Sequence, residues 1–382
     1  MPSTQPHVAY LDSVRGLAAL AVIGSHYVRA YDLPCRSNFC DRLLTYSPLH
    51  IWWDGEAAVS LFFVLSGLVL SLKHFRLTTT PDLSNYHFLA FILGRIFRIW
   101  PAYLLVLVVS ALLYQRYQWC FANFPATVPR QNGWLSTLWG QPAGWADFLK
   151  DSFLLGMRMK MVFVPQAWTL SIELALSLLV PVGILLVARS TSWLVFFSLF
   201  AIFPLGVSAF LFHFMLGIVI AKHKHTLSLW LRSNRVYKHL AWLCGLFLYT
   251  MGETSDAWVS PDAIGWLTGL GAGVLLASVI ASAKSQRILS LPILRYLGKI
   301  SYSIYLIHFA VLINTTPLLL HQLNASDDAF LFAWWLGFVA TIACSVCLAA
   351  LSYRFVEVPS MALGKRLGRT VAAGGFLSNC RI

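Results

Sequence analysis

The chain has 382 residues, of which 58% are hydrophobic and only 11% are charged, and its formal net charge is +13. An average soluble domain has about 45–50% apolar and about 25% charged residues, so this chain has too few polar residues to cover a soluble core. The composition excludes a water-soluble enzyme, a disordered chain and a secreted disulfide scaffold, and it predicts an all-α protein, a polytopic membrane helix bundle.

Ten apolar segments along the chain predict about ten transmembrane helices, several of them shorter than the roughly 20 residues of an average span. The segments are Leu11–Val28, Val59–Leu72, Phe88–Tyr114, Ala167–Val187, Trp193–Leu205, Ser208–Ala221, His239–Met251, Ile264–Ala283, Ser301–Leu320 and Ala329–Tyr353. The pair at 193–221 is one apolar stretch that Pro204 and Gly206 interrupt, and it is interpreted as a tight outer hairpin.

The basic residues give these segments an orientation, because cytoplasmic connections of membrane proteins are enriched in Lys and Arg. With ten alternating spans and the N-terminus inside, 20 of the 28 Lys and Arg residues fall on cytoplasmic segments. Both termini are therefore predicted to be cytoplasmic. Residues 1–360 are expected to form a single transmembrane domain, and residues 361–382 a short basic cytoplasmic tail. The positive charge thus indicates membrane topology, and no nucleic-acid partner is expected.

Two long outer loops are predicted, at about residues 29–58 and 115–166. The second loop contains four tryptophans, Trp119, Trp134, Trp139 and Trp145. They are interpreted either as anchors at the membrane interface or as an aromatic surface that receives a sugar or lipid. In the first loop, Cys35 and Cys40 would form a disulfide if the loop faces an oxidising compartment. Cys244, Cys344 and Cys347 lie in apolar runs, where a thiol is usually a small apolar group, and no metal ion is expected.

Charged residues within apolar segments are costly, and four runs that contain them are candidates for function. The first run is YLDSVRGLAAL, starting at Tyr10, followed by His26. Arg15 and His26 are eleven residues apart, so they share a helix face with about 16 Å of rise between them. We expect a basic group at the inner mouth and an imidazole near mid-membrane. The alternatives are a snorkelling arginine and a structural histidine.

The second run is GRIFRIWPAY, starting at Gly94. Arg95 and Arg98 are three residues apart, hence neighbours on one helix face, at the predicted inner end of the third span. Guanidinium groups bind phosphate oxygens in a bidentate way, so the pair is a candidate phosphate site. The alternative is that the pair only anchors the span on the cytoplasmic side.

The third run is AWTLSIE, which ends at Glu173 in a helix expected to enter from outside. Glu173 would lie about 10 Å below the outer face, at a depth comparable with that of His26. An ion pair or a carboxylate-oriented histidine is then feasible. The alternative is that Glu173 pairs with another arginine.

The fourth run is LGKISYSIYLIH, which ends at His308. Ser301, Tyr305 and His308 follow the i, i+4, i+7 pattern of one helix face, so they line a cavity or hydrogen-bond a neighbouring helix. Ser66, in the triplet LSG, gives a weaker signal that small residues at a helix contact also explain.

Together these runs resemble the acyltransferase 3 family of integral membrane acyltransferases, and the resemblance covers nearly the whole chain in order. It is carried by Arg15 with His26, by Phe62–Gly67, by Arg95 and Arg98 ahead of Pro101–Tyr103, by Trp168–Glu173, by Ser301–His308, and by Glu357 with Pro359. The chain departs from the family pattern at Thr169, where Ser is usual. It also departs at Leu174–Ser177, where the family often has a second Glu and then Gln-Phe-Tyr.

The resemblance implies an O-acyltransferase that moves an acyl group, expected to be acetyl, from cytoplasmic acyl-CoA to a hydroxyl of a glycan, a lipid-linked precursor or a similar acceptor. The donor is a substrate, so no permanently bound cofactor is expected, and the remaining partners are the acceptor and membrane lipids. The expected location is the bacterial inner membrane, and residues 1–360 would be the acyltransferase domain.

This hypothesis gives each candidate residue a role. The phosphates of CoA would be bound by Arg15, Arg95 and Arg98. The catalytic residues would be His26 as general base and Glu173 as the group that orients it. The substrate pore is expected to be lined by Asp12, Ser66, Trp168, Ser171, Ser301, Tyr305 and His308.

Two other classes of protein carry ionisable residues within spans. One is a proton-coupled transporter or flippase of a glycan-related substrate, and the other is a non-catalytic subunit of a glycan export machine. The chain lacks the paired half-sequences that often build transporters, and its arginines cluster at the predicted inner mouth.

Overall fold

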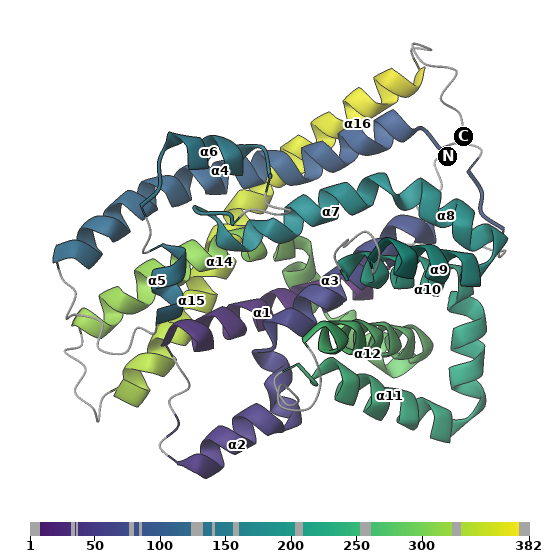
Figure 1. Ribbon diagram of the computed structural model, residues 1–382, viewed down its shortest axis with the longest axis horizontal. Coiled ribbons are helices and arrows are strands. Elements are labelled where there is room, and N and C mark those ends of the chain that lie inside the picture. The colour runs from purple at the N-terminus through teal and green to yellow at the C-terminus, as the bar shows by residue number, and fades with distance from the viewer. Residues whose placement is uncertain are drawn as a thin grey trace. The chain divides into compact units, whose positions relative to one another are not determined.

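The computed structural model (Figure 1) describes residues 8–31, 35, 37–75, 80–83, 86–123, 133–139, 142–155, 160–202, 209–252, 261–322 and 330–373. All regular elements of these residues are helical, which confirms the prediction of an all-α fold. The chain divides into two compact units. The first unit consists of Met1–Ala21, Leu44–Asn85 and Leu176–Lys299, and the second of Val22–Leu43, Tyr86–Ala175 and Ile300–Ile382.

The helices are assigned to the units as follows. Two helices that run through both units are α1 (Ala9–Tyr31) and α14 (Pro292–Gln322). The first unit contains η1 (Pro48–Trp52), α3 (Gly55–Leu72), α8 (Val180–Arg189), α9 (Thr191–Ile202), α10 (Phe210–Ser233), α11 (Arg235–Tyr249), α12 (Pro261–Ala281) and α13 (Ala283–Leu289). The second unit contains most of α2 (Asn38–Tyr46) and of α7 (Trp168–Leu178), with α4 (Phe88–Asn123), α5 (Gly133–Leu138), α6 (Trp145–Ser152), η3 (Pro165–Ala167), α15 (Phe330–Ser352), a π-helical turn (Tyr353–Glu357) and α16 (Val358–Ala373).

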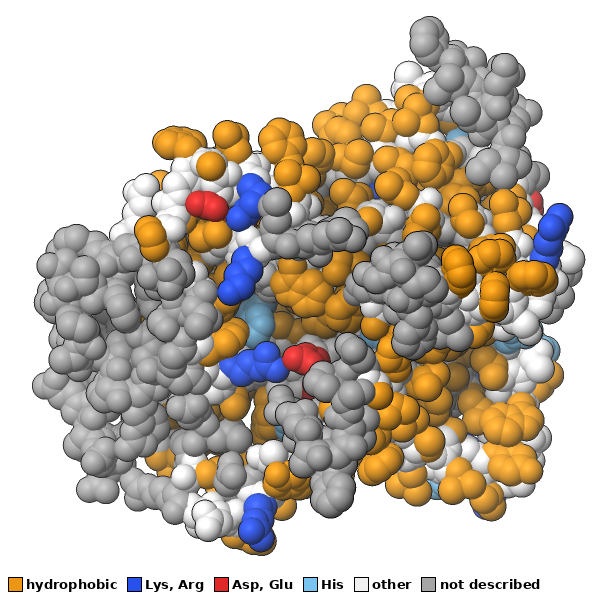
Figure 2. All heavy atoms as spheres, viewed as in Figure 1, with side chains coloured by type: hydrophobic (Ala, Val, Ile, Leu, Met, Phe, Trp, Pro, Cys, Tyr) orange, Lys and Arg blue, Asp and Glu red, His pale blue; other side chains and the backbone are white. Residues whose placement is uncertain are grey.

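Several helices have the length and composition of membrane spans. Five segments of the described residues qualify, namely Gly55–Leu72, Phe88–Arg116, Ala263–Ala281, Pro292–Pro317 and Leu331–Ala373, and a sixth is added if the bent pair α7 and α8 is one span. Large apolar side chains are exposed on many helices, and hydrophobic side chains (orange) outnumber charged ones among the described residues visible in Figure 2. The protein is therefore a multi-pass integral membrane protein. The expectation of about ten spans exceeds this number and stays a prediction.

In the first unit, α3 packs against α10 and α12, and α11 packs against α12. Helix α3 begins where Oδ1 of Asp54 accepts a hydrogen bond from the Ala57 N–H at 2.8 Å, the usual role of an aspartate N-cap. Helix α10 continues well past the predicted end of its span. Its last turns are held because Leu231 packs against Ala277 and Ala281, and because Nε of Arg232 donates to the Ala281 carbonyl at 2.8 Å.

The predicted outer hairpin at 193–221 is seen in part. Helices α9 and α10 are both present and pack against each other. The connection between them, with Pro204 and Gly206, lies outside the described residues.

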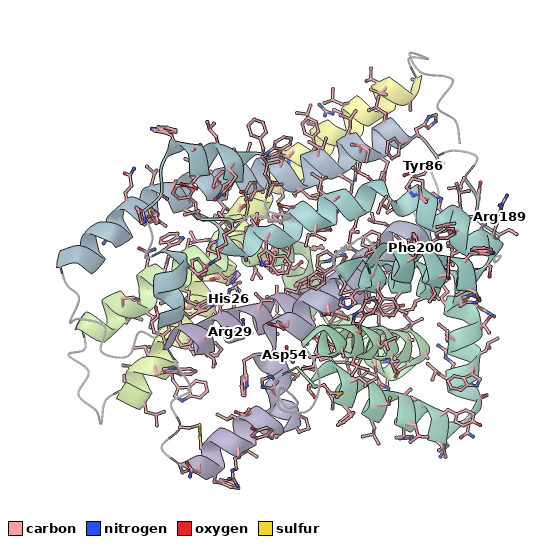
Figure 3. All side chains as sticks on the ribbon, in the orientation of Figure 1. His26, Arg29, Asp54, Tyr86, Arg189 and Phe200 are labelled. Atoms are coloured by element: carbon pink, nitrogen blue, oxygen red, sulfur yellow. A yellow bond between two sulfur atoms is a disulfide. The ribbon has the colours of Figure 1, made fainter. Side chains whose placement is uncertain are left out.

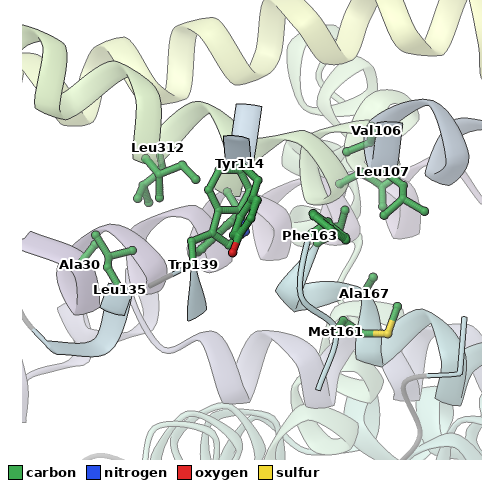
Figure 4. Close-up of a cluster of buried hydrophobic side chains, with 14 of the residues drawn as sticks. Ala30, Val106, Leu107, Tyr114, Leu135, Trp139, Met161, Phe163, Ala167 and Leu312 are labelled. Carbon is green, nitrogen blue, oxygen red and sulfur yellow. The ribbon is translucent and has the colours of Figure 1, made fainter. Parts of the chain in front are cut away.

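In the second unit, described residues between α4 and α7 contribute to an aromatic core (Figure 4). Tyr114 packs edge-on against Trp139 and Phe163, with ring centroids 5.5 and 5.3 Å apart. Trp139 is fully buried and so is a core residue, whereas Trp145 is 80% exposed. The side chain of Trp119 lies outside the described residues.

Two aromatic residues of α4 fix the end of α6. The Trp100 indole donates to the Ser152 carbonyl at 2.8 Å, and the Tyr103 hydroxyl donates to the Asp151 carbonyl at 2.7 Å. Oδ2 of Asp151 in turn accepts from the backbone N–H groups of Val162 and Phe163. Burial raises the pKa of the Asp151 carboxyl, and these two hydrogen bonds oppose that shift. These bonds join the end of α6 to Val162 and Phe163, which lie just before η3.

The predicted span Ala167–Val187 is broken into α7 and α8, which are bent by 53°. Pro181 stands in the first turn of α8, and it has no N–H to donate to the preceding turn. The Leu179 N–H bonds to the Leu176 carbonyl three residues back, which ends α7 with a tighter turn. The apolar composition alone did not show this break.

Part of the predicted tail at 361–382 is helical. Residues up to Ala373 form α16, which follows the π-helical turn and packs against α4. Gly364 lies against Phe97, and Gly368 lies against Ala90. Residues 374–382 lie outside the described part of the chain.

Helices α1 and α14 touch backbone to backbone in the first unit. An added Cβ at Gly16 would lie 2.7 Å from the amide nitrogen of Gly298, and one at Gly298 would overlap the backbone of Asp12. No other residue permits this approach, because every other side chain begins with a Cβ. The contact joins the first and fourth runs of the sequence.

We expect Gly298→Ala to destabilise the protein by about 1–3 kcal/mol, because the new methyl group meets backbone that cannot rotate away. Thermal unfolding in detergent measures the effect. Gly265→Ala is the matched control, since Gly265 is also within a helix and nothing lies within 4 Å of an added Cβ there. Equal melting temperatures for the two variants would contradict the close approach of α1 and α14.

Candidate functional site

The structure gathers most of the predicted site residues in the second unit. These are His26, Arg95, Arg98, Trp168, Ser171, Glu173, Ser301, Tyr305 and His308, whereas Asp12, Arg15 and Ser66 belong to the first unit. Helix α1 contributes His26, α4 the arginines, α7 the third run and α14 the fourth. Ser171 and Ser301 are buried, and Trp168 is half-buried.

Two histidines form the centre of the site. Nδ1 of His26 lies 2.8 Å from Nε2 of His308, and the two rings stack with their centroids 5.0 Å apart. Trp134 and Phe309 flank the His26 ring at centroid distances of 5.4 and 6.1 Å. Figure 3 labels His26 on α1, together with Arg29 one turn further along. The His308 side chain is fully buried, whereas His26 is half-buried.

The His308 side of the pair is tied to the start of α7. Tyr305, one turn earlier on α14, donates its hydroxyl proton to the Gln166 carbonyl at 3.0 Å and lies 2.8 Å from the Thr169 hydroxyl. Nε2 of Gln166 donates to the carbonyls of Tyr305 and Leu306 at 3.2 and 2.8 Å. In the described part of the chain, this leaves Oε1 of Gln166 buried without a hydrogen-bond partner.

Glu173 binds an arginine. Its Oε1 accepts a hydrogen bond from Nη2 of Arg95 at 2.6 Å, with the side chains 23% and 14% exposed. This was the alternative to a carboxylate that orients His26. Charge-assisted bonds of this kind are about twice as strong as neutral ones.

The contact between Arg95 and Glu173 corrects the depths that the sequence suggested. Arg95 was expected at the inner end of its span, and Glu173 about 10 Å below the outer face. Two atoms 2.6 Å apart lie at one depth. Helix α4 has 36 residues, or about 54 Å, so its second turn is not forced to the membrane edge.

Arg98 binds a second carboxylate, that of Glu357. Nη1 of Arg98 lies 3.7 Å from Oε2 of Glu357, whose side chain is 0% exposed. Oε1 of Glu357 accepts a short hydrogen bond from the Ser303 hydroxyl at 2.5 Å, and that hydroxyl also contacts Ser352 at 2.9 Å. The π-helical turn Tyr353–Glu357 contains this carboxylate, and such turns often occur at functional sites. Arg98 also lies over the Tyr302 ring at 5.9 Å.

The residues of the first unit have local partners. Nη1 of Arg15 lies 3.4 Å from Oδ1 of Asp12, one turn earlier on α1. Ser66 lies on α3 next to Gly67, which packs against the backbone of Phe214 on α10. This position fits the reading of Ser66 as a small residue at a helix contact.

Sequence reasoning missed three polar residues of the second unit. Gln166 and Ser303 were not singled out, and Glu357 was noted only within a terminal motif. The signal was present for Glu357, because a carboxylate in an apolar helix needs a partner. No sequence pattern indicated Gln166, whose role depends on contacts with α14. The described residues contain no group of three or more His, Cys, Asp or Glu that could hold a metal ion.

Comparison with known proteins identifies one match. A family model described as an acyltransferase domain matches residues 8–354. No curated protein matches the chain significantly, and no solved structure does so either. The matched range includes both histidines, both arginines and Glu173, whereas Glu357 lies just beyond it.

We expect Arg98→Ala to destabilise the protein by about 3–5 kcal/mol, because it leaves the buried carboxylate of Glu357 without its cation. The double variant Arg98→Ala/Glu357→Gln should recover much of this loss, since the remaining amide is neutral. Thermal unfolding in detergent measures both. Arg354→Ala is the control, because Arg354 is an exposed cation in the same π-helical turn. A single variant as stable as this control would show that the ion pair does not stabilise the fold.

Proposed function

The chain belongs to the acyltransferase 3 family, and from this premise we propose that it transfers an acyl group, expected to be acetyl, from cytoplasmic acyl-CoA to a hydroxyl of a glycan, a glycolipid precursor or a similar acceptor. The observation that carries the proposal is the imidazole of His26, half-buried among apolar helices and held by a second imidazole. A neutral imidazole is the commonest general base near pH 7. A sugar hydroxyl needs such a base to attack a thioester.

The proposed reaction has one base and no covalent intermediate on the protein. His26 removes the proton of the acceptor hydroxyl while the oxygen attacks the thioester carbonyl. The carbon–sulfur bond then breaks, and the thiolate of CoA takes the proton back from the imidazolium. The products are the ester and free CoA thiol, so the protein returns to its starting state.

The donor would lie along α14 between the arginines and the histidines. Arg98 lies over Tyr302, and His308 is six residues further along the helix, which corresponds to about 9 Å of rise. A phosphate group at the arginines would leave the flexible pantetheine arm of CoA to reach His26. A guanidinium has five N–H donors, so it can bind a phosphate beside its protein partners. Arg95 donates to Glu173, and Arg98 donates to Sδ of Met361 and lies 3.7 Å from Glu357. Oε1 of Gln166 is an acceptor for an amide N–H of that arm.

Arg15 stays a proposed phosphate ligand, because a guanidinium suits phosphate oxygens. Its Nη1 lies 3.4 Å from Oδ1 of Asp12. The double variant Arg98→Ala/Glu357→Gln tests donor binding, because it removes the cation and leaves no unpaired buried carboxylate.

The acceptor would enter on the side of the tryptophan-rich loop. Trp134 lies against the His26 ring, and an aromatic face suits the apolar face of a sugar. Cys35 and Cys40, in the predicted outer loop at about residues 29–58, form a disulfide. This disulfide supports the placement of that loop in an oxidising compartment. We therefore retain the topology with about ten spans, cytoplasmic termini, a single acyltransferase domain over residues 1–360 and a basic tail at 361–382. The bacterial inner membrane is the proposed location.

An assay of the purified protein with acyl-CoA labelled in the acyl group tests this function. We expect release of CoA thiol that depends on a glycan or lipid acceptor, and a loss of about 10²–10⁴-fold in rate for His26→Asn. Asparagine keeps a polar group near the position of Nδ1 but has none at Nε2, so the contact with His308 can persist. Thiol release that does not depend on acceptor, or an unchanged rate in the variant, would contradict the proposal. Complete absence of release would favour a transporter, a flippase or an export subunit.

Cysteine labelling in intact cells tests the topology. In a background without free cysteines, Trp145→Cys should react with a membrane-impermeant maleimide, and Trp230→Cys should react only after the membrane is opened. Both side chains are exposed, at 80% and 54%, so access to the label is not limited by burial. The reverse pattern would invert the proposed orientation.

A further inference from the structure

We propose that His308 is a positioning residue that holds His26 in a single tautomer, with the proton on Nδ1 and the lone pair on Nε2. The proposal rests on the proposed function, because it names the atom of His26 that accepts the proton of the acceptor hydroxyl. It also assigns the orienting role, expected of Glu173, to an imidazole.

The backbone of α14 determines which ring nitrogen of His308 carries the proton. Nδ1 of His308 lies 2.8 Å from the Tyr305 carbonyl oxygen and 3.3 Å from that of Ile304. A carbonyl oxygen only accepts hydrogen bonds, so Nδ1 of His308 must carry the proton. In a neutral imidazole the other nitrogen then has the lone pair, and Nε2 of His308 is an acceptor.

The tautomer of His308 in turn determines that of His26. Nε2 of His308 lies 2.8 Å from Nδ1 of His26, and two lone pairs would repel each other at that distance. Nδ1 of His26 therefore donates its proton, which leaves the lone pair of a neutral His26 ring on Nε2. In the described part of the chain, Nε2 of His26 forms no hydrogen bond, so it remains available to a substrate.

Both rings are neutral before the reaction on physical grounds. A buried imidazolium is costly unless a carboxylate lies beside it. Neither histidine forms an ion pair with a carboxylate among the described residues, where Glu173 and Glu357 are bound to the two arginines. Arg29, one turn from His26 on α1, adds a positive charge to the same side, and the other groups against the ring are the aromatic side chains Trp134 and Phe309.

The pair becomes more strongly bonded as the reaction proceeds. When Nε2 of His26 takes the hydroxyl proton, the ring becomes an imidazolium, and its Nδ1–H donates a charge-assisted bond to the lone pair of His308. When the thiolate of CoA takes the proton from Nε2, the neutral tautomer returns. His308 neither gains nor loses a proton in this cycle, so its effect is on the orientation and charge of His26.

The tautomer can be measured without turnover. The ¹⁵N chemical shift of a histidine ring separates a protonated from an unprotonated nitrogen, and the signals of His26 are those that vanish in His26→Asn. In the purified protein labelled with ¹⁵N-histidine, we expect a protonated Nδ1 and an unprotonated Nε2 for His26. A protonated Nε2 would overturn the proposal.

Two variants of His308 separate positioning from packing. The side-chain oxygen of glutamine reaches about as far as Nε2 of histidine, so His308→Gln keeps an acceptor for the His26 N–H. Asparagine reaches only as far as Nδ1, so His308→Asn keeps the bond to the backbone and loses the acceptor. We expect His308→Gln to retain kcat within about tenfold, and His308→Asn to lose about 10²–10⁴-fold in kcat with KM for acyl-CoA nearly unchanged.

The control variant is His213→Asn. His213 is also buried, its Nε2 lies 3.0 Å from the Gly265 carbonyl oxygen, and it has no role in the proposed reaction. It should lose stability and keep its kcat. Equal loss of kcat in His308→Gln and His308→Asn, with folding intact by thermal unfolding, would overturn the positioning role.

The outcomes of this inference and of the proposed function are distinguishable. If the wild-type protein transfers no acyl group, the proposed function fails, while the ¹⁵N spectrum still decides the tautomer. If transfer is normal and His26 carries its proton on Nε2, the proposed function stands and the role of His308 is wrong.

Discussion

The contact between α1 and α14 is the constraint on which the proposed chemistry depends. The two helices touch at Gly16 and Gly298, and they meet again at His26 and His308. The interval between glycine and histidine is ten residues on both helices, so two helices with the same rise per residue bring both pairs into register. A one-residue shift of either helix would rotate its histidine by about 100° and break the pair. The first and fourth runs of the sequence therefore depend on each other, because the spacing between glycine and histidine has to be the same on both helices.

Two arginines of the second unit, Arg95 and Arg98, are each matched by a carboxylate. Arg95 is bound to Glu173, and Arg98 to Glu357, so the four charges of these pairs sum to zero. Unpaired charges in apolar surroundings are costly, and removing one partner costs more than removing both. The same pairing links α4 to α7 and to the turn before α16. An anionic ligand at the arginines would therefore meet groups that are already held in place by their carboxylates.

The sequence was sufficient for the helical class and for the membrane environment, because composition is a local signal. It also singled out His26, which the structure pairs with His308. It was not sufficient for the partners. Glu173 was assigned to His26 from estimated depths, but its carboxylate binds Arg95, a residue 78 positions away that only the folded chain brings close. Pro181 by itself indicates a break in the helix, but the apolar composition of the segment led to the prediction of one continuous span. The contacts of Gln166 with α14 join residues about 140 positions apart, which no local pattern reveals.

The continuous helical segment Leu331–Ala373 has a further consequence. Its 43 residues extend about 65 Å, roughly twice the hydrocarbon thickness of a bilayer. Its apolar part is α15 (Phe330–Ser352), whose 23 residues extend about 35 Å, whereas α16 carries Lys365, Arg366 and Arg369. The contacts of Gly364 and Gly368 with α4 and the hydrogen bond of Glu357 hold the polar part in place. Helix α3 has 18 residues and a length of about 27 Å, which is slightly less than the hydrocarbon thickness of a bilayer. A thicker bilayer would therefore exceed the apolar length of α3 before it exceeds that of α15.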